Sequence, residues 1–500
     1  MMRLLSLVTY DLRALRRERG AVLLLAASLL LACYGLFEGA RQRQHVLQAQ
    51  HAAVAQEAGA RREANALAAR YFAAPDDPRF AGMLWYRTPV DVRGYAFREH
   101  VGFAALAPLA GSALAIGQSD LLAPTVRVRA ESMESVRTAA GIEHPARLAA
   151  GRYDLVFFTV YLWPLVLLSL CASVLTQDRE SLRLRSLLLQ GAGTARIVFA
   201  QVGARTLLAT LLLVAVVCGA ALAGGAVPLD ERGLAALAQW AGLVLLYSAF
   251  WGALAMAVCA CAADRMGAAF AGFGLWLLFA IVLPGLLDAA VRFHAPVPPR
   301  ERYVQALRDA GDRVAADRAG SLARFYDSHP EWKPRRTAPG AVSASVSRLQ
   351  RAQELDKAMA GVDTAFGRAE AARAALFARL SMASPVTLAN GAFAALAGND
   401  RERHARFVAA VGVHQAALRD WFQDAIQRAA LGDEAAPCQR TCLGGYGFRD
   451  FDAVPRFTPP APLASPAQVP ARTWTLLAWL AAFVSFAGAA LRRERLRQRL

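Results

Sequence analysis

Six long apolar stretches separate the polar parts of this chain, and they constrain its fold more than any other feature of the sequence. A helix needs about 20 apolar residues to cross the roughly 30 Å hydrocarbon core of a bilayer. The stretches run over residues 21–37, 155–175, 204–224, 234–261, 267–287 and 473–491. With 56% hydrophobic residues and a mean hydropathy of +0.29, they predict a polytopic α-helical membrane protein.

Arginines flank the first and the last of these stretches and indicate how the chain is inserted. They stand at Arg13, Arg16, Arg17 and Arg19 and at Arg492, Arg493, Arg495, Arg497 and Arg499. Short segments next to membrane spans keep their basic residues on the cytoplasmic side. Both ends are therefore expected to be cytoplasmic. Two cytoplasmic ends require an even number of crossings, and six satisfies that requirement.

The stretches divide the chain into inner, membrane and outer segments. We expect a cytoplasmic basic N-terminus (1–20), a first span (21–37), a first outer domain (38–153), a second span (154–175), an inner segment (176–203), spans three to five (204–287), a second outer domain (288–472), a sixth span (473–491) and a cytoplasmic basic tail (492–500). The links between spans three, four and five are short, so these helices should pack antiparallel.

The two long outer segments differ in pattern. The first continues from its span without helix breakers as far as Tyr71, and Pro75 and Pro78 then end the predicted helix. Alternation over residues 125–129 predicts a strand, so this domain should be small and mixed α/β. The second segment has apolar residues at helical spacing and should be mainly helical. Its part after residue 432 is rich in Gly and Pro and should be irregular.

Composition and motifs argue against several classes of function. The formal charge of +17 comes from dispersed arginines that alternate with acids, without a basic stripe or an aromatic platform, so we expect no nucleic-acid partner. The sequence contains no phosphate-binding loop, no zinc-binding helix and no nucleophile elbow. We therefore expect no catalytic residue, metal or cofactor in this chain. If ATP is used, another subunit must bind it.

Two cysteines stand apart from the other five, which lie in apolar runs. Cys438 and Cys442 belong to a polar stretch of the second outer domain. In an oxidising compartment a local disulfide is expected between them, and free thiols are the alternative. A metal site would need further ligands, and no histidine stands nearby.

The inner segment after span two carries the most informative pattern. Residues 176–191 read TQDRESLRLRSLLLQG, a charged, amphipathic helix that follows a span. One interpretation is a helix on the membrane surface, held by anionic lipid. The other is a coupling helix that docks in a groove of an ATPase. That role would involve Asp178, Arg179, Glu180, Leu184, Arg185, Leu187 and Leu188, with the leucines facing the groove. Periodicity alone does not choose between the two.

This segment resembles the region after the second span in ABC-2-type transporter permeases, whose usual form is Glu-x-Glu-x-Gly-Thr-Leu before a Leu-rich run. Asp178 and Glu180 match the acids, whereas residues 182–183 depart from Gly-Thr. Further similarities point to a branch with two large periplasmic insertions of uncharacterised function. They lie at residues 117–121 (Gly-Gln-Ser-Asp-Leu), 151–155, 161–165, 328–331 and 398–400, and at His404 and Phe407.

The resemblance implies a permease in the bacterial inner membrane, with both ends cytoplasmic and both insertions periplasmic. Such a permease pairs with itself or a sister permease and with two cytoplasmic ATPases, which hold ATP and Mg. Closure of the ATPases would push on the coupling helix and rearrange the spans. Lipid surrounds the spans, and the insertions are placed to meet a periplasmic partner. Substrate does not follow from a family resemblance.

Two smaller features have open interpretations. Gln118, Ser119 and Asp120 form either a side-chain-stabilised turn before the strand, which we favour, or a ligand site. Arg205 near the start of span three is expected to extend its side chain toward the cytoplasmic boundary.

Two rival functions stay open. One is a membrane sensor or scaffold whose outer domains bind a partner. The other is a membrane-bound enzyme acting on lipid or cell wall, although no catalytic pair is visible.

Overall fold

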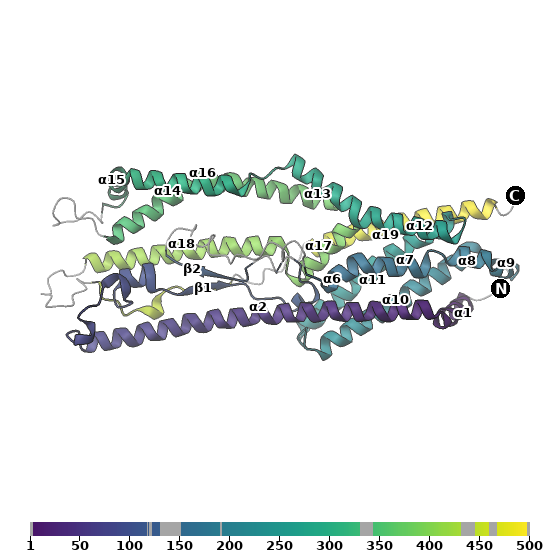
Figure 1. Cartoon of the computed structure of the whole chain (residues 1–500), viewed down its shortest axis with the longest axis horizontal. Coiled ribbons are helices and arrows are strands. Elements are labelled where there is room, and N and C mark those ends of the chain that lie inside the picture. The colour runs from purple at the N-terminus through teal and green to yellow at the C-terminus, as the bar shows by residue number, and fades with distance from the viewer. Residues whose placement is uncertain are drawn as a thin grey trace.

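The computed structural model describes residues 4–117, 119, 123–130, 152–190, 193–330, 344–431, 446–459 and 468–497. It is elongated, and helices make up 81% of it. Six of its helices are long and apolar enough to cross a membrane, as the sequence predicts. They gather in one half of the molecule, and the other half, formed by the two long segments between spans, we name the outer part (Figure 1). The chain is therefore a helical protein with six candidate membrane spans.

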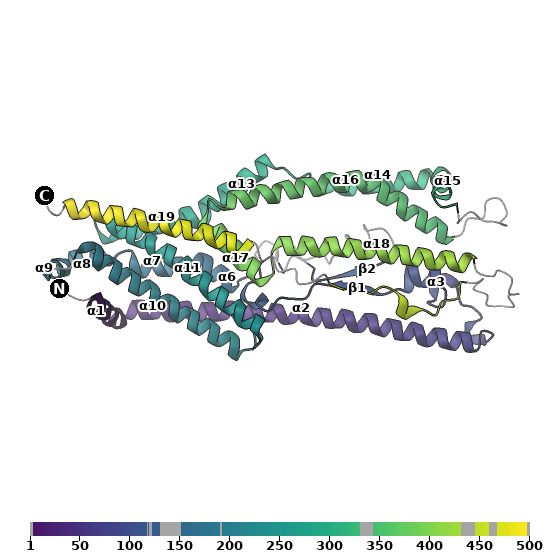
Figure 2. The ribbon, with the colours of Figure 1, turned by 180° about the vertical axis from the view of Figure 1, so that it is seen from behind.

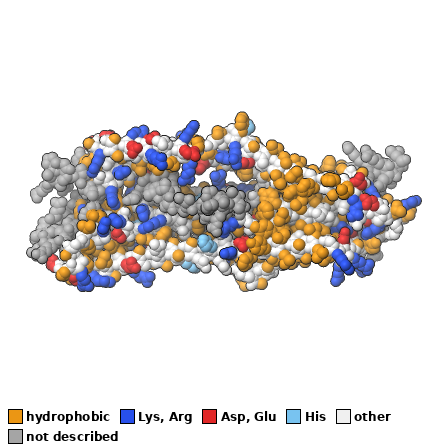
Figure 3. Space-filling view, viewed as in Figure 1, with side chains coloured by type: hydrophobic (Ala, Val, Ile, Leu, Met, Phe, Trp, Pro, Cys, Tyr) orange, Lys and Arg blue, Asp and Glu red, His pale blue; other side chains and the backbone are white. Residues whose placement is uncertain are grey.

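The candidate spans follow the apolar stretches closely. They are α2 (Arg19–Ala73), the composite Leu155–Glu180, α10 (Thr194–Ala223), α11 (Glu231–Cys261), the composite Arg265–His294 and α19 (Gln468–Arg497), of which Pro470–Arg492 is the apolar part. A short helix, α1 (Leu4–Arg17), precedes the first span. Both α1 and the end of α19 lie at the same end of the molecule (Figure 1). Hydrophobic side chains form a belt over this half, and charged side chains border it (Figure 3).

The second span is interrupted, and neighbouring helices compensate for the interruption. It consists of α6 (Leu155–Phe157), a π-helical turn (Phe158–Leu162), α7 (Trp163–Cys171) and α8 (Val174–Glu180). Pro164 has no N–H, so the carbonyl of Val160 loses its usual helical donor. The hydroxyl of Tyr247 on α11 donates to this carbonyl at 2.8 Å instead. The fifth span has a similar turn (Leu278–Val282) between α12 (Arg265–Leu277) and α13 (Leu283–His294).

The outer part confirms two local predictions from the sequence. Helix α2 continues without a break to Ala73, just before Pro75, as expected. Residues 125–128 form strand β2 (Thr125–Val128), which pairs antiparallel with β1 (Gly102–Ala105). The remaining elements are short turns around α3 (Val92–Gly94) and the long helices α14 (Arg300–Ala316), α15 (Arg318–Ser328), α16 (Ala344–Ser381) and α18 (Arg401–Leu431).

The two outer segments share one apolar core. Tyr71 and Tyr95 come from the first segment, while Phe422 and Phe451 come from the second. Tyr95 contacts both phenylalanines edge-on, with ring centroids 6.0 and 4.9 Å apart. The bridge between Asp91 and Gly447 also joins the segments. Residues expected in two separate domains thus pack around the same aromatic cluster.

A short apolar helix, α17 (Pro385–Ala397), returns from the outer part to the spans. Its buried residues Leu388 and Phe393 belong to the same apolar cluster as the spans. It packs against one end of α19, and α19 packs against α11 (Figure 2). With 13 residues it is too short to cross a bilayer, and the sequence analysis places no separate element there.

Candidate functional sites

The predicted coupling segment forms two short helices at the end of the molecule that also holds α1 and the end of α19 (Figure 1). Helix α8 continues span two, and α9 (Arg183–Leu189) follows it at an angle. Leu182 between them has a φ of 58°, in the left-handed region that costs a non-glycine residue energy. The single amphipathic helix expected from the sequence is therefore bent at this residue.

Asp178 is buried and connects the bend between α8 and α9 to α10 and, through Arg183, to α1. Its carboxylate accepts a hydrogen bond from Gln201 of α10 at 2.8 Å, and Arg183 lies 3.5 Å away. The guanidinium of Arg183 in turn stacks 4.5 Å above the ring of Tyr10 on α1. A displacement of α9 is therefore transmitted to α1 and α10.

The neighbouring charges connect α8 to the link before span five. Arg179 donates to the carbonyl of Ala262 at 3.1 Å. Glu180 lies 3.9 Å from the guanidinium of Arg265, an exposed pair that contributes little stability by itself. All three predicted charges at 178–180 thus contact other spans of the same chain.

The leucines of this segment divide into buried and exposed sets. Leu184 and Leu187, predicted to face an ATPase groove, are instead buried in the chain's own apolar cluster. Leu182 and Leu189 are 72% and 81% exposed, and Leu188 and Arg185 are also exposed. We name the surface formed by Leu182, Arg185, Leu188 and Leu189 the leucine cap. It projects beyond the spans, where a soluble partner would have access to it.

Arg205, expected to extend its side chain toward the cytoplasmic boundary, is instead buried between span two and α1. Its guanidinium donates to both carboxylate oxygens of Asp11 at 2.8 Å and to the carbonyl of Leu170 at 2.8 Å. Three hydrogen bonds to these two residues satisfy a charge that would otherwise be costly to bury. This pair fixes α1 to span three.

A second candidate site lies where the spans meet the outer part. Asn399, just before α18, donates to the carbonyls of Ser112 and Ala115 at 3.3 and 2.5 Å. Asp154 accepts hydrogen bonds from the backbone of Ile116 at 2.9 Å and of Phe157 at 2.7 Å, which caps α6. Gly117, Asp154 and Asn399, one described residue from each of three segments that carry the family resemblance, therefore lie close together here.

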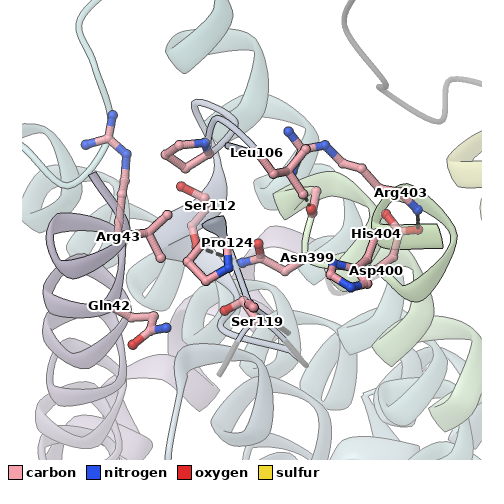
Figure 4. Close-up of a pocket in the computed structure, with 14 residues that line it drawn as sticks. Gln42, Arg43, Leu106, Ser112, Ser119, Pro124, Asn399, Asp400, Arg403 and His404 are labelled. Carbon is pink, nitrogen blue, oxygen red and sulfur yellow. Dashed lines mark hydrogen bonds between the residues drawn. The ribbon is translucent and has the colours of Figure 1, made fainter. Parts of the chain in front are cut away.

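Beside these residues, and lined in part by Asn399, is a cavity of about 40 Å³, which we name the junction pocket. Arg43 of α2 lies on one side, Arg403 and His404 of α18 lie on the other, and Ser112, Ser119 and Asn399 lie between them (Figure 4). The remaining lining residues are Gln42, Val46, Leu106, Pro108, Ala123, Pro124, Gly398 and Asp400. Of the predicted Gln118-Ser119-Asp120 motif, Ser119 lines this pocket, whereas Gln118 and Asp120 lie outside the described residues.

Several buried polar atoms of the junction pocket have no hydrogen-bond partner among the described residues. They are Nε of Arg43, Oγ of Ser112, Oγ of Ser119, Oδ2 of Asp400 and Nε of Arg403. An unsatisfied buried donor or acceptor costs about 1–3 kcal/mol. Their concentration around one cavity indicates a ligand or ordered water there.

Hydrogen bonds to the backbone hold the charged side chains of the junction pocket in position. Two other nitrogens of Arg403 donate to the carbonyls of Gly398 and Ala107, at 2.9 and 2.5 Å. Oδ1 of Asp400 accepts from the backbone of Arg403 at 3.0 Å. Burial lowers the pKa of His404, which keeps its ring neutral near pH 7. Two arginines and one aspartate therefore leave the pocket with net positive charge.

The other predicted sites receive no structural description. Cys438 and Cys442 lie outside the described residues. Within the described ranges, no group of three or more His, Cys, Asp or Glu side chains is placed to hold a metal ion.

Comparison with known proteins gives one partial match. Residues 300–435 match a family model described as a domain of unknown function (DUF3526). The match covers α14 to α18, including α17 and the Asn399-to-His404 side of the junction pocket, and none of the six candidate spans. No curated protein matches this chain. No solved structure matches it either.

Proposed function

We propose that this chain is the membrane-spanning permease subunit of an ATP-binding cassette transporter. In this role it resides in the bacterial inner membrane, beside a second permease and surrounded by lipid. Separate cytoplasmic ATPase subunits hold ATP and Mg, and this chain catalyses no reaction itself. The two outer segments lie in the periplasm, where a substrate or partner protein is met.

The leucine cap is the observation that carries the proposal. Soluble surfaces rarely expose neighbouring leucines without a partner to cover them. Leu182 and Leu189 project from the end of span two, and Arg185 offers a charge beside them. An apolar ridge with a charged rim suits the groove of a protein partner. This arrangement supports docking of an ATPase on the cytoplasmic side.

The contacts beneath the leucine cap support force transmission. Asp178 links α8 to α10 through Gln201 and approaches Arg183, which packs on Tyr10 of α1. Glu180 and Arg179 link α8 to the segment that precedes span five. Movement of a docked ATPase would therefore act on spans two, three and five together rather than on one helix.

The test is co-purification from native membranes in a mild detergent, with mass spectrometry and ATP hydrolysis as readouts. The wild-type chain should retain an ATPase subunit. The double variant Leu182→Asp with Leu189→Asp should retain roughly tenfold less, because the apolar contact is lost.

The matched control is Leu229→Asp with Leu234→Asp, two exposed leucines at the opposite end of spans three and four. It should keep the ATPase. Retention of the ATPase by the leucine-cap variant would contradict docking at this surface. Absence of any ATPase from the wild-type complex would favour a membrane sensor or scaffold instead.

A further inference from the structure

We propose that the junction pocket binds a monoanionic oxyanion, namely the phosphate group of a phospholipid or free inorganic phosphate. This binding site does not depend on the proposed transport role, because neither the residues of the pocket nor the experiment below involves an ATPase. The proposal is based on the cavity between Arg43 and Arg403 and on the unsatisfied polar atoms around it.

The donors of the pocket select an anion. Arg403 is only 5% exposed and Ser112 only 6%, yet Nε of the arginine and Oγ of the serine have no partner among the described residues. Nε of Arg43 and Oγ of Ser119 are also buried atoms without a described hydrogen-bond partner. Guanidinium groups only donate, and hydroxyl groups also donate. Their natural partner is a group that presents several acceptor oxygens, such as phosphate.

The net charge of the pocket and the volume of the cavity further limit which ligands can bind. Arg43 and Arg403 supply two positive charges and Asp400 supplies one negative charge, so one negative charge on the ligand gives neutrality. Oδ2 of Asp400, also without a described partner, can accept from a ligand hydroxyl. A cavity of about 40 Å³ has room for roughly three water molecules. That space fits a compact headgroup fragment and excludes a large solute.

The position of the pocket brings both sources of phosphate within reach. Gln42 and Arg43 of the pocket follow the predicted first span, which ends at residue 37, so the pocket lies just beyond the membrane part of α2. Phospholipid headgroups occupy this level beside a membrane protein. Arg152, which does not line the pocket, donates to Gln42 at 2.6 Å.

The experiment uses the full-length chain, purified in detergent and depleted of phospholipid. Its thermal unfolding midpoint is measured against inorganic phosphate, with chloride at equal ionic strength as the reference. A second arm adds phosphatidylglycerol, compared with diacylglycerol, which has acyl chains and no phosphate. A ligand that binds only the folded chain raises the midpoint.

A rise with inorganic phosphate identifies a free oxyanion site. A rise with phosphatidylglycerol alone identifies a headgroup site, and both results support the proposal. If neither compound raises the midpoint relative to its reference, the proposal is wrong.

Two variants locate the effect within the fold. Arg43→Gln should weaken phosphate or phosphatidylglycerol binding roughly tenfold or more, because a charge-assisted hydrogen bond is lost. Arg41→Gln is the matched control, since Arg41 lies on the same helix with its side chain 74% exposed. It should bind like the wild type. Ser119→Ala, which changes no charge, should weaken binding less than Arg43→Gln. Equal affinity in the Arg43 and Arg41 variants would overturn the site.

Discussion

The end of the spans that carries α1 and α8 differs from the junction pocket in how buried charged groups are paired. At the end with α1 and α8, Arg205 pairs with Asp11 and Asp178 accepts a hydrogen bond from Gln201, while Oε1 of Gln201 and two nitrogens of Arg183 have no described partner. At the junction pocket and in the outer core, Arg403 and Ser112 keep unsatisfied atoms, and neither ring nitrogen of His100 has a described partner. Paired groups fix helices to one another, whereas the unsatisfied atoms of the junction pocket are available to a ligand, and the buried ring of His100 resists protonation.

The largest effect should follow from breaking the pair between Arg205 and Asp11. Arg205→Met leaves the carboxylate buried without its partner, which should cost about 3–5 kcal/mol of stability. The double variant with Asp11→Leu should recover most of that loss. Thermal stability in detergent, followed by size-exclusion chromatography, measures both. A single variant as stable as the wild type would show that this pair does not fix α1 to span three.

Asp178→Asn should have the next largest effect. The amide keeps the shape of the side chain and loses the attraction to Arg183, so stability should fall by about 1 kcal/mol. Under the proposed function, stimulation of the partner ATPase should fall several-fold. Glu180→Gln, at the exposed pair with Arg265, is the comparison and should change both quantities less. The reverse order would contradict the role of the buried acid.

His100 should make the outer part sensitive to acid. Burial lowers the pKa of His100 from 6.5 to about 3. Between pH 6.5 and about pH 3, the unfolded chain therefore binds a proton at this residue that the folded chain does not bind. Stability that is present above about pH 6.5 is therefore lost as pH falls, with a slope approaching about 1.4 kcal/mol per pH unit. His100→Leu should flatten this part of a plot of unfolding midpoint against pH. An unchanged slope in the His100→Leu variant would contradict this prediction.

The smallest effects compare two buried serines. The hydroxyl of Ser248 accepts a hydrogen bond from Nε1 of Trp163 at 3.0 Å, whereas that of Ser112 has no described partner. Ser248→Ala should cost about 1–2 kcal/mol, because it leaves the indole N–H unpaired. Ser112→Ala should be nearly neutral without ligand. Equal losses of stability in the two variants would remove the distinction between paired and unsatisfied groups.

The sequence predicts those elements whose signals are local. Six apolar stretches give the spans, and the prolines at 75 and 78 mark the end of α2. The sequence does not predict α17 as a separate element, because its 13 residues are too few to cross a membrane. The bend at Leu182 has no signal, since no glycine marks a left-handed residue there.

The parts of the sites that sequence reasoning misses depend on distant contacts. Asp11 and Arg205 are 194 positions apart, and no local pattern joins them. The junction pocket combines residues of α2, of the segment around Ser112 and of the start of α18. Sequence resemblance draws attention to the segments of Gly117, Asp154 and Asn399 separately, and only the fold brings these three residues together.

The length of α2 has a consequence for how the two halves of the molecule communicate. Residues 38–73 extend beyond the predicted first span in one unbroken helix, roughly 54 Å long. At Gly39 this helix touches the backbone of Ala113 so closely that a side chain would not fit. A tilt of about 10° around that contact would swing the far end of α2 by roughly 9 Å. Small rotations among the spans are thereby magnified into ångström-scale displacements at the periphery of the outer part.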